Sequence, residues 1–344
     1  MSAQLGVSVV SPFFNEASII RNAVCRMARN LDAQFGADWE LILVDDGSTD
    51  DSRRIVTELL QTEEFPQVSL VGYDRNQGRG RALMSGIMAA RADIIVTTEV
   101  DCSWGDDIVR RLVDAMEAPS KPHMVAASVH APGGGLINVP LIRRLLTSYG
   151  NALIRLLVDP KISMSTGMTR AYRRQVIQPL IVNENGKEFH LEVILKLRTL
   201  GFRIDEIPAT ITWDSHRLEN NTPGQARKSK TNLLKTINSH VIFVAIGHPS
   251  RYFGVASILS IAISSILLLD SIWRLLTGDV AIYVALIAIL GYMFALTLAG
   301  FAVVFSQLKE VMRENWMRPY PHPWPPSALQ GRLLATGKRP PVSE

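Results

Sequence analysis

Residues 41–51 read LILVDDGSTDD, four apolar residues followed by a polar and acidic turn. A short continuous apolar run that ends in turn residues is typical of a buried strand. One side chain of the Ser-Thr-Asp sequence can cap the helix expected over residues 52–60. Capping does not explain why two carboxylates, Asp45 and Asp46, stand at the end of the strand. These two acids are therefore candidates for binding a ligand.

The same plan repeats on both sides of this stretch. Apolar runs at 7–10, 68–71 and 94–96 each end in a polar cluster, and helical periodicity follows at 19–27 and 82–90. Strands that alternate with helices at this spacing predict an α/β fold with a doubly wound, mostly parallel sheet. Ligands of such sheets bind beyond the carboxyl ends of the strands, which is where all the polar clusters fall.

The loop RNQGRGR at residues 75–81 follows the third strand. Its glycines allow another backbone or a ligand to approach closely, and Arg79 and Arg81 offer positive charge to phosphates. Taken alone, a loop of this composition is more often only a loop. The chain contains neither GxGxxG after its first strand nor GxxxxGK[ST], which argues against dinucleotide-binding and P-loop folds.

The stretch TTEVDCSWGDD at residues 97–107 follows the fourth strand and carries Glu99 and Asp101. Two interpretations compete: an ordinary solvated strand end, or a pair of carboxylates that holds a cation over an anionic ligand. The two cysteines, Cys25 and Cys102, lie far apart in the sequence and predict reduced thiols rather than a disulfide or a metal cluster.

Two uncharged segments near the C-terminus predict a transmembrane hairpin. About 20 apolar residues are needed to cross the hydrocarbon layer, so we expect spans over residues 252–273 and 280–305. Basic residues flank the outer ends, whereas the short connection offers only Arg274 against two aspartates. The positive-inside rule then places both ends of the hairpin in the cytoplasm.

The predicted organisation has four parts. They are a cytoplasmic sheet domain over 1–225, a basic juxtamembrane segment over 226–251, the membrane helices within 252–308, and a proline-rich cytoplasmic tail over 309–344 that we expect to be unpacked. No signal peptide precedes the first strand, so we expect the first 240 or so residues to stay on the cytoplasmic side. The two apolar segments predict a multi-pass protein of the cell membrane. The net charge of +4 is concentrated beside the apolar segments, which predicts contact with membrane lipids and not with nucleic acid.

Taken in order, four stretches resemble the inverting glycosyltransferase family 2, which has the GT-A fold. They are VVSPFFNE at 9–16, VDDGSTD at 44–50, NQGRGRA at 76–82 and EVD at 99–101. The membrane hairpin narrows the resemblance to polyprenyl-phosphate sugar synthases, similar to dolichol-phosphate mannose synthase and the undecaprenyl-phosphate glucosyltransferases. The resemblance covers residues 5–240 in sequence and the membrane part in architecture only.

The resemblance assigns roles to residues near the strand ends. Contacts with the nucleotide sugar are implied for Pro12, Phe13, Asn15, Glu16, Asp45, Asp46, Arg79 and Arg81. Glu99 and Asp101 match the family's DxD motif, whose carboxylates hold Mg²⁺ or Mn²⁺ against the donor diphosphate. Asp101 occupies the final Asp and is the predicted catalytic ligand. Glu99 replaces the first Asp, and three modes stay open for it: direct binding of the cation, binding through water, or none.

The acceptor implied by the resemblance is a lipid phosphate, which is already ionised at neutral pH and needs no general base. Arg217, Ser229 and Lys230 are implied contacts of that phosphate, and Glu192 and Lys230 are implied to act in catalysis. The alternative for each cation is a juxtamembrane basic patch without a catalytic role. Residues 140–158 fit either an interfacial amphipathic helix or a helix of the core.

A further departure from the family lies at residues 164–166. Met164, Ser165 or Thr166 stands where relatives usually carry an aspartate, so no role in binding metal or acceptor is assigned there. His123, His130 and His190 are scattered and are expected to be structural.

The predicted function is transfer of a hexose, with inversion, from a UDP- or GDP-sugar to polyprenyl phosphate at the cytoplasmic face of the membrane. Two alternatives are kept: transfer to another lipid or glycan, and a non-catalytic GT-A-like membrane protein that binds nucleotide. No motif selects the sugar or the base. Membrane enzymes of this kind commonly associate, so a homo-oligomer is considered beside a monomer.

Overall fold

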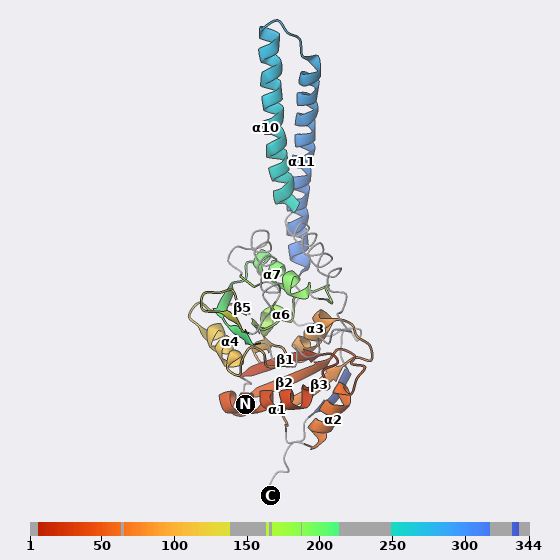
Figure 1. Cartoon of the computed structure of the whole chain (residues 1–344), viewed down its shortest axis with the longest axis vertical. Helices are drawn as coiled ribbons and strands as arrows, with labels where there is room; N and C mark the ends of the chain where they lie inside the picture. Colours follow the sequence, from red (N-terminus) through yellow and green to blue (C-terminus); the bar gives the residue numbers. More distant parts are fainter. Residues whose placement is uncertain are drawn as a thin grey trace. The chain divides into compact units, whose positions relative to one another are not determined.

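The computed structural model describes residues 6–62, 65–137, 163–164, 167–186, 188–212, 249–316 and 332–336 (Figure 1). The chain divides into two compact units. The first comprises Met1–Ser229 and Met317–Glu344, and the second is Lys230–Trp316. The predicted boundary at residue 225 falls outside the described residues.

The first unit is built on an eight-stranded sheet with the strand order β10-β3-β2-β1-β4-β7-β5-β8. Its strands are β1 (Val7–Phe13), β2 (Trp39–Asp45), β3 (Val68–Gly72), β4 (Ile94–Thr97), β5 (Met124–Ser128), β7 (Arg170–Arg173), β8 (Ile204–Pro208) and β10 (Arg332–Thr336). A separate parallel pair joins β6 (Gly135–Ile137) to β9 (Thr210–Thr212). The strands β3, β2, β1 and β4 are parallel, while β7 and β10 run antiparallel to their neighbours. The predicted mostly parallel α/β sheet is therefore confirmed.

Helices cover both faces of this sheet (Figure 1). They are α1 (Ile20–Phe35), α2 (Ser52–Thr62), α3 (Arg79–Ala89), α4 (Ile108–Glu117), α6 (Arg174–Ile177) and α7 (Phe189–Thr199). Because successive side chains of a strand point to opposite faces, Val9 packs in the core formed with α1, α2 and α4, and Val10 packs in the core formed with α3 and α7. This burial on both faces explains why the strands read as continuous apolar runs.

Two element boundaries differ from the prediction. The first strand extends to Phe13, so Pro12 and Phe13 end a strand and do not belong to a loop. Helix α3 begins at Arg79, which places Arg79 and Arg81 in the first helical turn and not in the preceding loop. The residue types of a strand do not mark where its pairing with the neighbouring strand ends. In this sheet β1 pairs with β2 as far as Phe13 and Asp45.

The expectation that the proline-rich tail is unpacked is wrong for residues 332–336. These residues form β10, an antiparallel edge strand on β3 with an irregularity between Leu333 and Ala335. Leu334 packs against the core, and its Cδ1 lies 2.9 Å from where a side chain on Gly72 would begin. The tail thus completes the sheet of the first unit.

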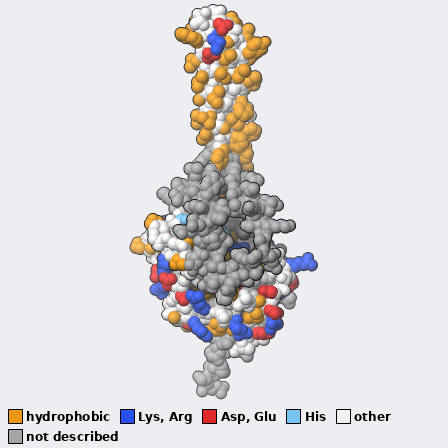
Figure 2. All heavy atoms as spheres, in the orientation of Figure 1, with side chains coloured by type: hydrophobic (Ala, Val, Ile, Leu, Met, Phe, Trp, Pro, Cys, Tyr) orange, Lys and Arg blue, Asp and Glu red, His pale blue; other side chains and the backbone are white. Residues whose placement is uncertain are grey.

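The second unit is a pair of long helices, α10 (Pro249–Leu276) and α11 (Ile282–Asn315). Tyr252–Leu276 and Ile282–Leu308 are long and apolar enough to cross a membrane. Figure 2 shows hydrophobic side chains over the surface of this pair and charged side chains at its loop, where Arg274 pairs with Asp270 and Asp279.

Small residues bring the two helices into close contact. The Ser257 hydroxyl donates to the Ala295 carbonyl at 2.8 Å, and the Ser260 hydroxyl donates to the Gly291 carbonyl at 3.1 Å. A Cβ on Gly291 would lie 2.1 Å from the Ser264 hydroxyl oxygen. Interfaces of small residues with interhelical hydrogen bonds are typical of helices that pack within lipid, whereas the outward apolar side chains stay exposed.

Candidate active site

One pocket lies at the carboxyl ends of β1, β2 and β4. It is lined by Pro12, Phe13, Phe14, Glu16, Asp46, Arg79, Glu99, Val100, Asp101 and Met168. Seven of the ten residues predicted to contact the nucleotide or the metal are therefore brought together. The parallel register places the end of β1 beside the ends of β2 and β4, with Phe13 opposite Asp45 and Val10 opposite Thr97.

Asn15 lies outside the pocket lining and joins two loops. Its backbone has a positive φ of 57°, a conformation that asparagine tolerates better than most residues. Its side-chain oxygen accepts hydrogen bonds from the backbone N–H of Thr49 at 2.8 Å and of Asp50 at 3.3 Å. Its own N–H donates to the Ser48 hydroxyl at 3.1 Å. Asn15 thus fixes the loop after β1 against the turn after β2.

Asp45 and Asp46 point to different partners although they are adjacent. Asp45 is fully buried, where its carboxylate forms an ion pair with Arg53 and accepts the Ser48 N–H at 2.9 Å. Arg53 also donates to the Tyr73 carbonyl. Asp45 therefore closes its own turn and lies outside the pocket lining.

Asp46 lines the pocket and holds the loop after β3. Its carboxylate accepts the N–H groups of Gln77 at 2.9 Å and Gly78 at 3.1 Å, and the Asn76 amide at 3.0 Å. Burial raises the pKa of Asp46, and these hydrogen bonds oppose that rise in part. The loop that carries Arg79 is thereby fastened to the end of β2.

Two glycines permit this close packing. Gly47 has φ +72°, and a Cβ there would lie 2.3 Å from the carbonyl carbon of Arg75. Gly78 has φ +100°, and a Cβ there would lie 2.4 Å from the carbonyl oxygen of Asn185. Both positions need a residue without a side chain because the backbone is left-handed and another backbone is in contact.

The two predicted arginines separate in the structure. Arg79 is exposed and lines the pocket at the N-terminus of α3. Arg81 lies later in the same helical turn and outside the pocket lining. Its carbonyl accepts a hydrogen bond from the Tyr73 hydroxyl at 3.3 Å. Arg79 is the better placed of the two to meet a phosphate in this pocket.

Glu99 and Asp101 form the acidic wall of the pocket. The Glu99 Oε2 accepts the indole N–H of Trp104 at 2.6 Å and the hydroxyl of Thr169 at 2.7 Å. Asp101 Oδ1 accepts the Ser103 N–H at 3.1 Å. Burial raises the pKa of Glu99, the Asp101 charge raises it further, and the two hydrogen bonds and Arg79 oppose the rise.

This donor set fits a hard divalent cation. Carboxylate oxygens are the ligands that Mg²⁺ and Mn²⁺ prefer, and a cation would relieve the repulsion between the two acids. The described residues contain no group of three or more His, Cys, Asp or Glu side chains that could hold a metal. A cation here would complete its shell with ligand phosphates and water, as Mg²⁺ usually does.

The acceptor predictions are mostly outside the described part of the chain. Arg217, Ser229 and Lys230 lie there, as do residues 140–158 and 165–166. Glu192 is described: it is buried on α7, pairs with Lys196 at 2.5 Å, and accepts the N–H groups of Asn183 and Glu184. These contacts hold the segment that packs on Gly78, and the predicted catalytic role of Glu192 stays a prediction.

Sequence reasoning missed Trp104, Thr169 and Arg53. Trp104 stands inside the quoted stretch at 97–107, where an aromatic residue between acids was the only available signal. Thr169 contacts Glu99 from 70 positions away along the chain, a distance at which local spacing carries no information.

The sequence profile described as "Glycosyl transferase family 2" matches residues 8–181. Undecaprenyl-phosphate 4-deoxy-4-formamido-L-arabinose transferase of Pectobacterium carotovorum is 32% identical over 181 residues, which is 51% of each chain. The protein with the same name from Klebsiella pneumoniae is 29% identical over 205 residues, 59% of this chain and 58% of that one. The chain thus aligns with little more than half the length of these relatives.

Among solved structures, glucosyl-3-phosphoglycerate synthase of Mycobacterium tuberculosis in complex with UDP has a TM-score of 0.48 and 19% identity, covering 68% of this chain and 79% of that chain. The family profile, by contrast, matches just over half of the chain and includes every residue that lines the pocket. The chain therefore belongs to glycosyl transferase family 2.

Proposed function

We propose that this protein transfers a sugar from a nucleoside diphosphate sugar to a polyprenyl phosphate at the cytoplasmic face of a membrane, with inversion at the anomeric carbon. The observation that carries the proposal is the single pocket in which Asp46, Arg79, Glu99 and Asp101 meet. The carboxylates of Glu99 and Asp101 together with the Arg79 guanidinium suit a diphosphate bound through a cation.

The chemistry required of the chain is mainly positioning. An oxygen of the lipid phosphate attacks the anomeric carbon from the side opposite the diphosphate, and the bond to the diphosphate breaks with its electron pair. The attacking phosphate is already ionised, so no proton has to be removed. A divalent cation held by Asp101 and Glu99 would neutralise the charge on the leaving diphosphate. Arg79 at the start of α3 adds a second positive group in the same pocket.

The acceptor is proposed from the relatives and from the helix pair. The relatives from Pectobacterium and Klebsiella are named as transferases that act with undecaprenyl phosphate. The apolar surface of α10 and α11 suits a membrane anchor, which would hold the pocket near lipid phosphates. Arg217, Ser229 and Lys230, which precede the helix pair in the sequence, are the proposed contacts of the lipid phosphate. Glu192 and Lys230 are proposed to act in catalysis.

The sugar is proposed as a hexose. The modified arabinose in the names of the relatives makes an amino- or formamido-pentose the first competing donor to test. UDP and GDP are both retained as the nucleotide, because the described contacts do not select a base.

The test uses the full chain purified in lipid nanodiscs with undecaprenyl phosphate and Mn²⁺ or Mg²⁺. A panel of radiolabelled UDP- and GDP-sugars, including modified pentoses, is offered and the lipid product is extracted and counted. We expect one donor to give product that disappears with EDTA or with the Asp101→Asn variant. If no donor is used although UDP or GDP binds, the protein is a nucleotide-binding relative without transferase activity and the proposal is wrong.

A further inference from the structure

Among the described residues, the hydrogen bonds that hold the Glu99 side chain all reach one of its two oxygens. Oε2 accepts two hydrogen bonds, from the Trp104 indole at 2.6 Å and from the Thr169 hydroxyl at 2.7 Å. Within the described residues, Oε1 accepts none. An ionised carboxylate can accept about four hydrogen bonds, so this arrangement leaves one oxygen available on the side chain that lines the pocket.

The two donors come from separate parts of the fold. Trp104 follows β4 in the loop that leads to α4, and Thr169 immediately precedes β7. Thr169 also contacts the Thr98 hydroxyl at 3.1 Å. Because Thr169 gives its only hydroxyl proton to Glu99, Thr98 is the donor in that second bond. The Glu99 carboxylate is therefore fixed from two directions, and rotation about its side-chain bonds would break one or both contacts.

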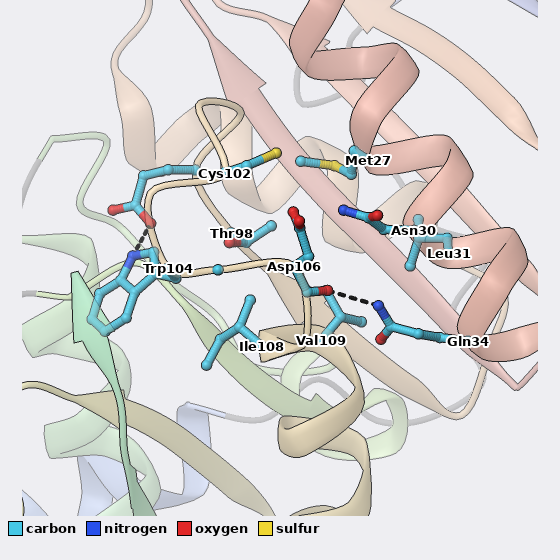
Figure 3. A pocket seen from close by; sticks show the side chains of 12 residues that line it. Met27, Asn30, Leu31, Gln34, Thr98, Cys102, Trp104, Asp106, Ile108 and Val109 are labelled. Atoms are coloured by element: carbon cyan, nitrogen blue, oxygen red, sulfur yellow. Dashed lines mark hydrogen bonds between the residues drawn. The ribbon is translucent and has the colours of Figure 1, made fainter. Parts of the chain in front are cut away.

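Trp104 is itself immobilised by packing and by its loop. Its side chain is 3% exposed, and the loop is fastened to α1 at Asp106. Arg26 pairs with the Asp106 carboxylate at 2.8 Å, and the Gln34 amide donates to the Asp106 carbonyl at 2.7 Å. Figure 3 shows Gln34 reaching Asp106 from α1, and a dashed line marks the hydrogen bond from the Trp104 indole to the Glu99 carboxylate.

This restraint matters because the residue is a glutamate. Glutamate has one more rotatable bond than aspartate, and freezing a long side chain costs about 1.5–2 kcal/mol of conformational entropy. A side chain that the protein already holds in one conformation loses little further entropy when it binds a cation. Residues that hydrogen-bond a metal ligand typically raise metal affinity by 10–100-fold.

We propose that Trp104 and Thr169 are positioning residues that fix Glu99 so that it binds the divalent cation through Oε1 alone. The inference rests on the proposed function in that it places the cation at Glu99 and Asp101. It assigns Glu99 as a direct ligand with one oxygen, and it makes the Trp104 indole N–H and the Thr169 hydroxyl necessary for that geometry.

The experiment measures Mn²⁺ binding to the full chain in detergent by electron paramagnetic resonance of free Mn²⁺, with Mn²⁺ alone and with Mn²⁺ plus UDP or GDP. Thr169→Val and Trp104→Phe each remove one donor and keep most of the side-chain shape. We expect each to weaken Mn²⁺ binding about 10-fold or more, and we expect Thr169→Ser, which retains the hydroxyl, to bind as the wild type does.

The chain offers a matched control. The Trp39 indole donates to the Asp32 carboxylate at 2.9 Å, and Trp39 is buried at the start of β2, outside the pocket lining. Trp39→Phe therefore removes the same type of hydrogen bond and lowers stability in the same way, but it should leave the Mn²⁺ affinity unchanged. Thermal unfolding of every variant shows whether it folds. If Trp104→Phe does not fold, the comparison of Thr169→Val with Thr169→Ser tests the proposal.

The outcomes separate this inference from the proposed function. If Thr169→Val is folded and binds Mn²⁺ as tightly as the wild type, the inference is wrong even if the wild type transfers sugar. Failure of the wild type to bind Mn²⁺, with and without nucleotide, also overturns it. If instead the variants weaken Mn²⁺ binding as expected and no sugar donor is used, the inference holds and the proposed function fails.

Discussion

The acids that end β2 and the acids that end β4 look alike in sequence and differ in their partners. Asp45 and Asp46 receive hydrogen bonds from backbone N–H groups of two loops and an ion pair from Arg53. Glu99 receives two side-chain donors on one oxygen. The acids at the end of β2 use their carboxylates to hold the neighbouring turn and loop in place. Glu99 and Asp101 line the pocket and are proposed to bind a cation there. What an acid at a strand end does therefore depends on how many of its oxygens the protein itself occupies.

The largest expected effect is on the β4 side. Asp101→Asn removes one of two charges proposed to hold the cation and keeps the shape of the side chain. We expect sugar transfer to fall roughly 10³-fold or more, equivalent to about 4 kcal/mol of activation free energy. Expression, membrane insertion and thermal unfolding should stay as in the wild type. Retention of a tenth of the activity would show that Asp101 is not the essential ligand.

The β2 side is expected to respond in stability. Arg53→Ala leaves the fully buried Asp45 carboxylate without its cation, and breaking such a pair costs about 3 kcal/mol or more. Thermal unfolding of the full chain in detergent should shift down by roughly 5–10 °C. Within the described part of the chain, the neighbouring Arg54 pairs only with exposed Asp51 and Glu58, so Arg54→Ala is the control and should change little. Equal shifts for the two variants would contradict the structure.

A third comparison uses the glycine in each strand-end loop. Gly47→Ala introduces a Cβ 2.3 Å from the Arg75 backbone at φ +72°, whereas Gly105→Ala, at φ +88°, meets only the Asp107 side chain at 3.3 Å. Both changes carry left-handed strain of about 1–2 kcal/mol, and Gly47→Ala must also displace a loop. We expect its unfolding temperature to drop clearly further than that of Gly105→Ala. The reverse order would mean that the 75–78 loop does not pack on Gly47.

The smallest expected effect is a difference in pH dependence within the β2 turn. Burial raises the pKa of Asp46 above its ordinary 3.8, so the folded protein takes up a proton before the unfolded chain does as the pH falls. As the pH falls from the raised pKa of Asp46 to 3.8, the free energy of unfolding of the wild type should therefore increase relative to that of Asp46→Asn.

Asp50 should behave in the opposite way. Burial would raise its pKa, but hydrogen bonds from Ser52 and Ala17 outweigh burial and lower it. Ionised Asp50 therefore stabilises the folded state above pH 3.8, and this stabilisation is lost as the pH falls through the pKa that Asp50 has in the folded protein. Unfolding temperatures of Asp46→Asn and Asp50→Asn, each compared with the wild type from pH 8 down to about pH 2.5, should therefore diverge in opposite directions on acidification. Parallel curves would contradict the environments of these two carboxylates.

The contrast between the two strand ends also explains what could be predicted from sequence. Apolar runs flanked by turn residues predicted β2, β3 and β4. Burial on both faces of a sheet requires a continuous apolar run, which can be read locally. The order of the polar clusters brought Asp46, Arg79 and Asp101 to one pocket, because parallel strands end at a common edge. The antiparallel strand β7 and the Thr169 contact with Glu99 could not be predicted in this way, because their partners are set by pairing across the sheet.

The tail shows the same limit. The five residues of β10 lie in a proline-rich neighbourhood whose composition indicates an extended and unpaired chain. What makes them a strand is the free edge of β3, which is remote in sequence. Local propensity is weak evidence for an edge strand because cross-strand partners decide its stability.

The position of β10 after α11 has a consequence for how the protein is made. The catalytic sheet keeps an open edge at β3 until the ribosome has produced both apolar helices and the strand beyond them. At about 5–20 residues per second this interval lasts roughly ten seconds or more, and an open edge is a template for pairing with other chains. Completion of the sheet is thereby coupled to synthesis of the helix pair, so a nascent chain that stops after α11 would carry an unprotected β3.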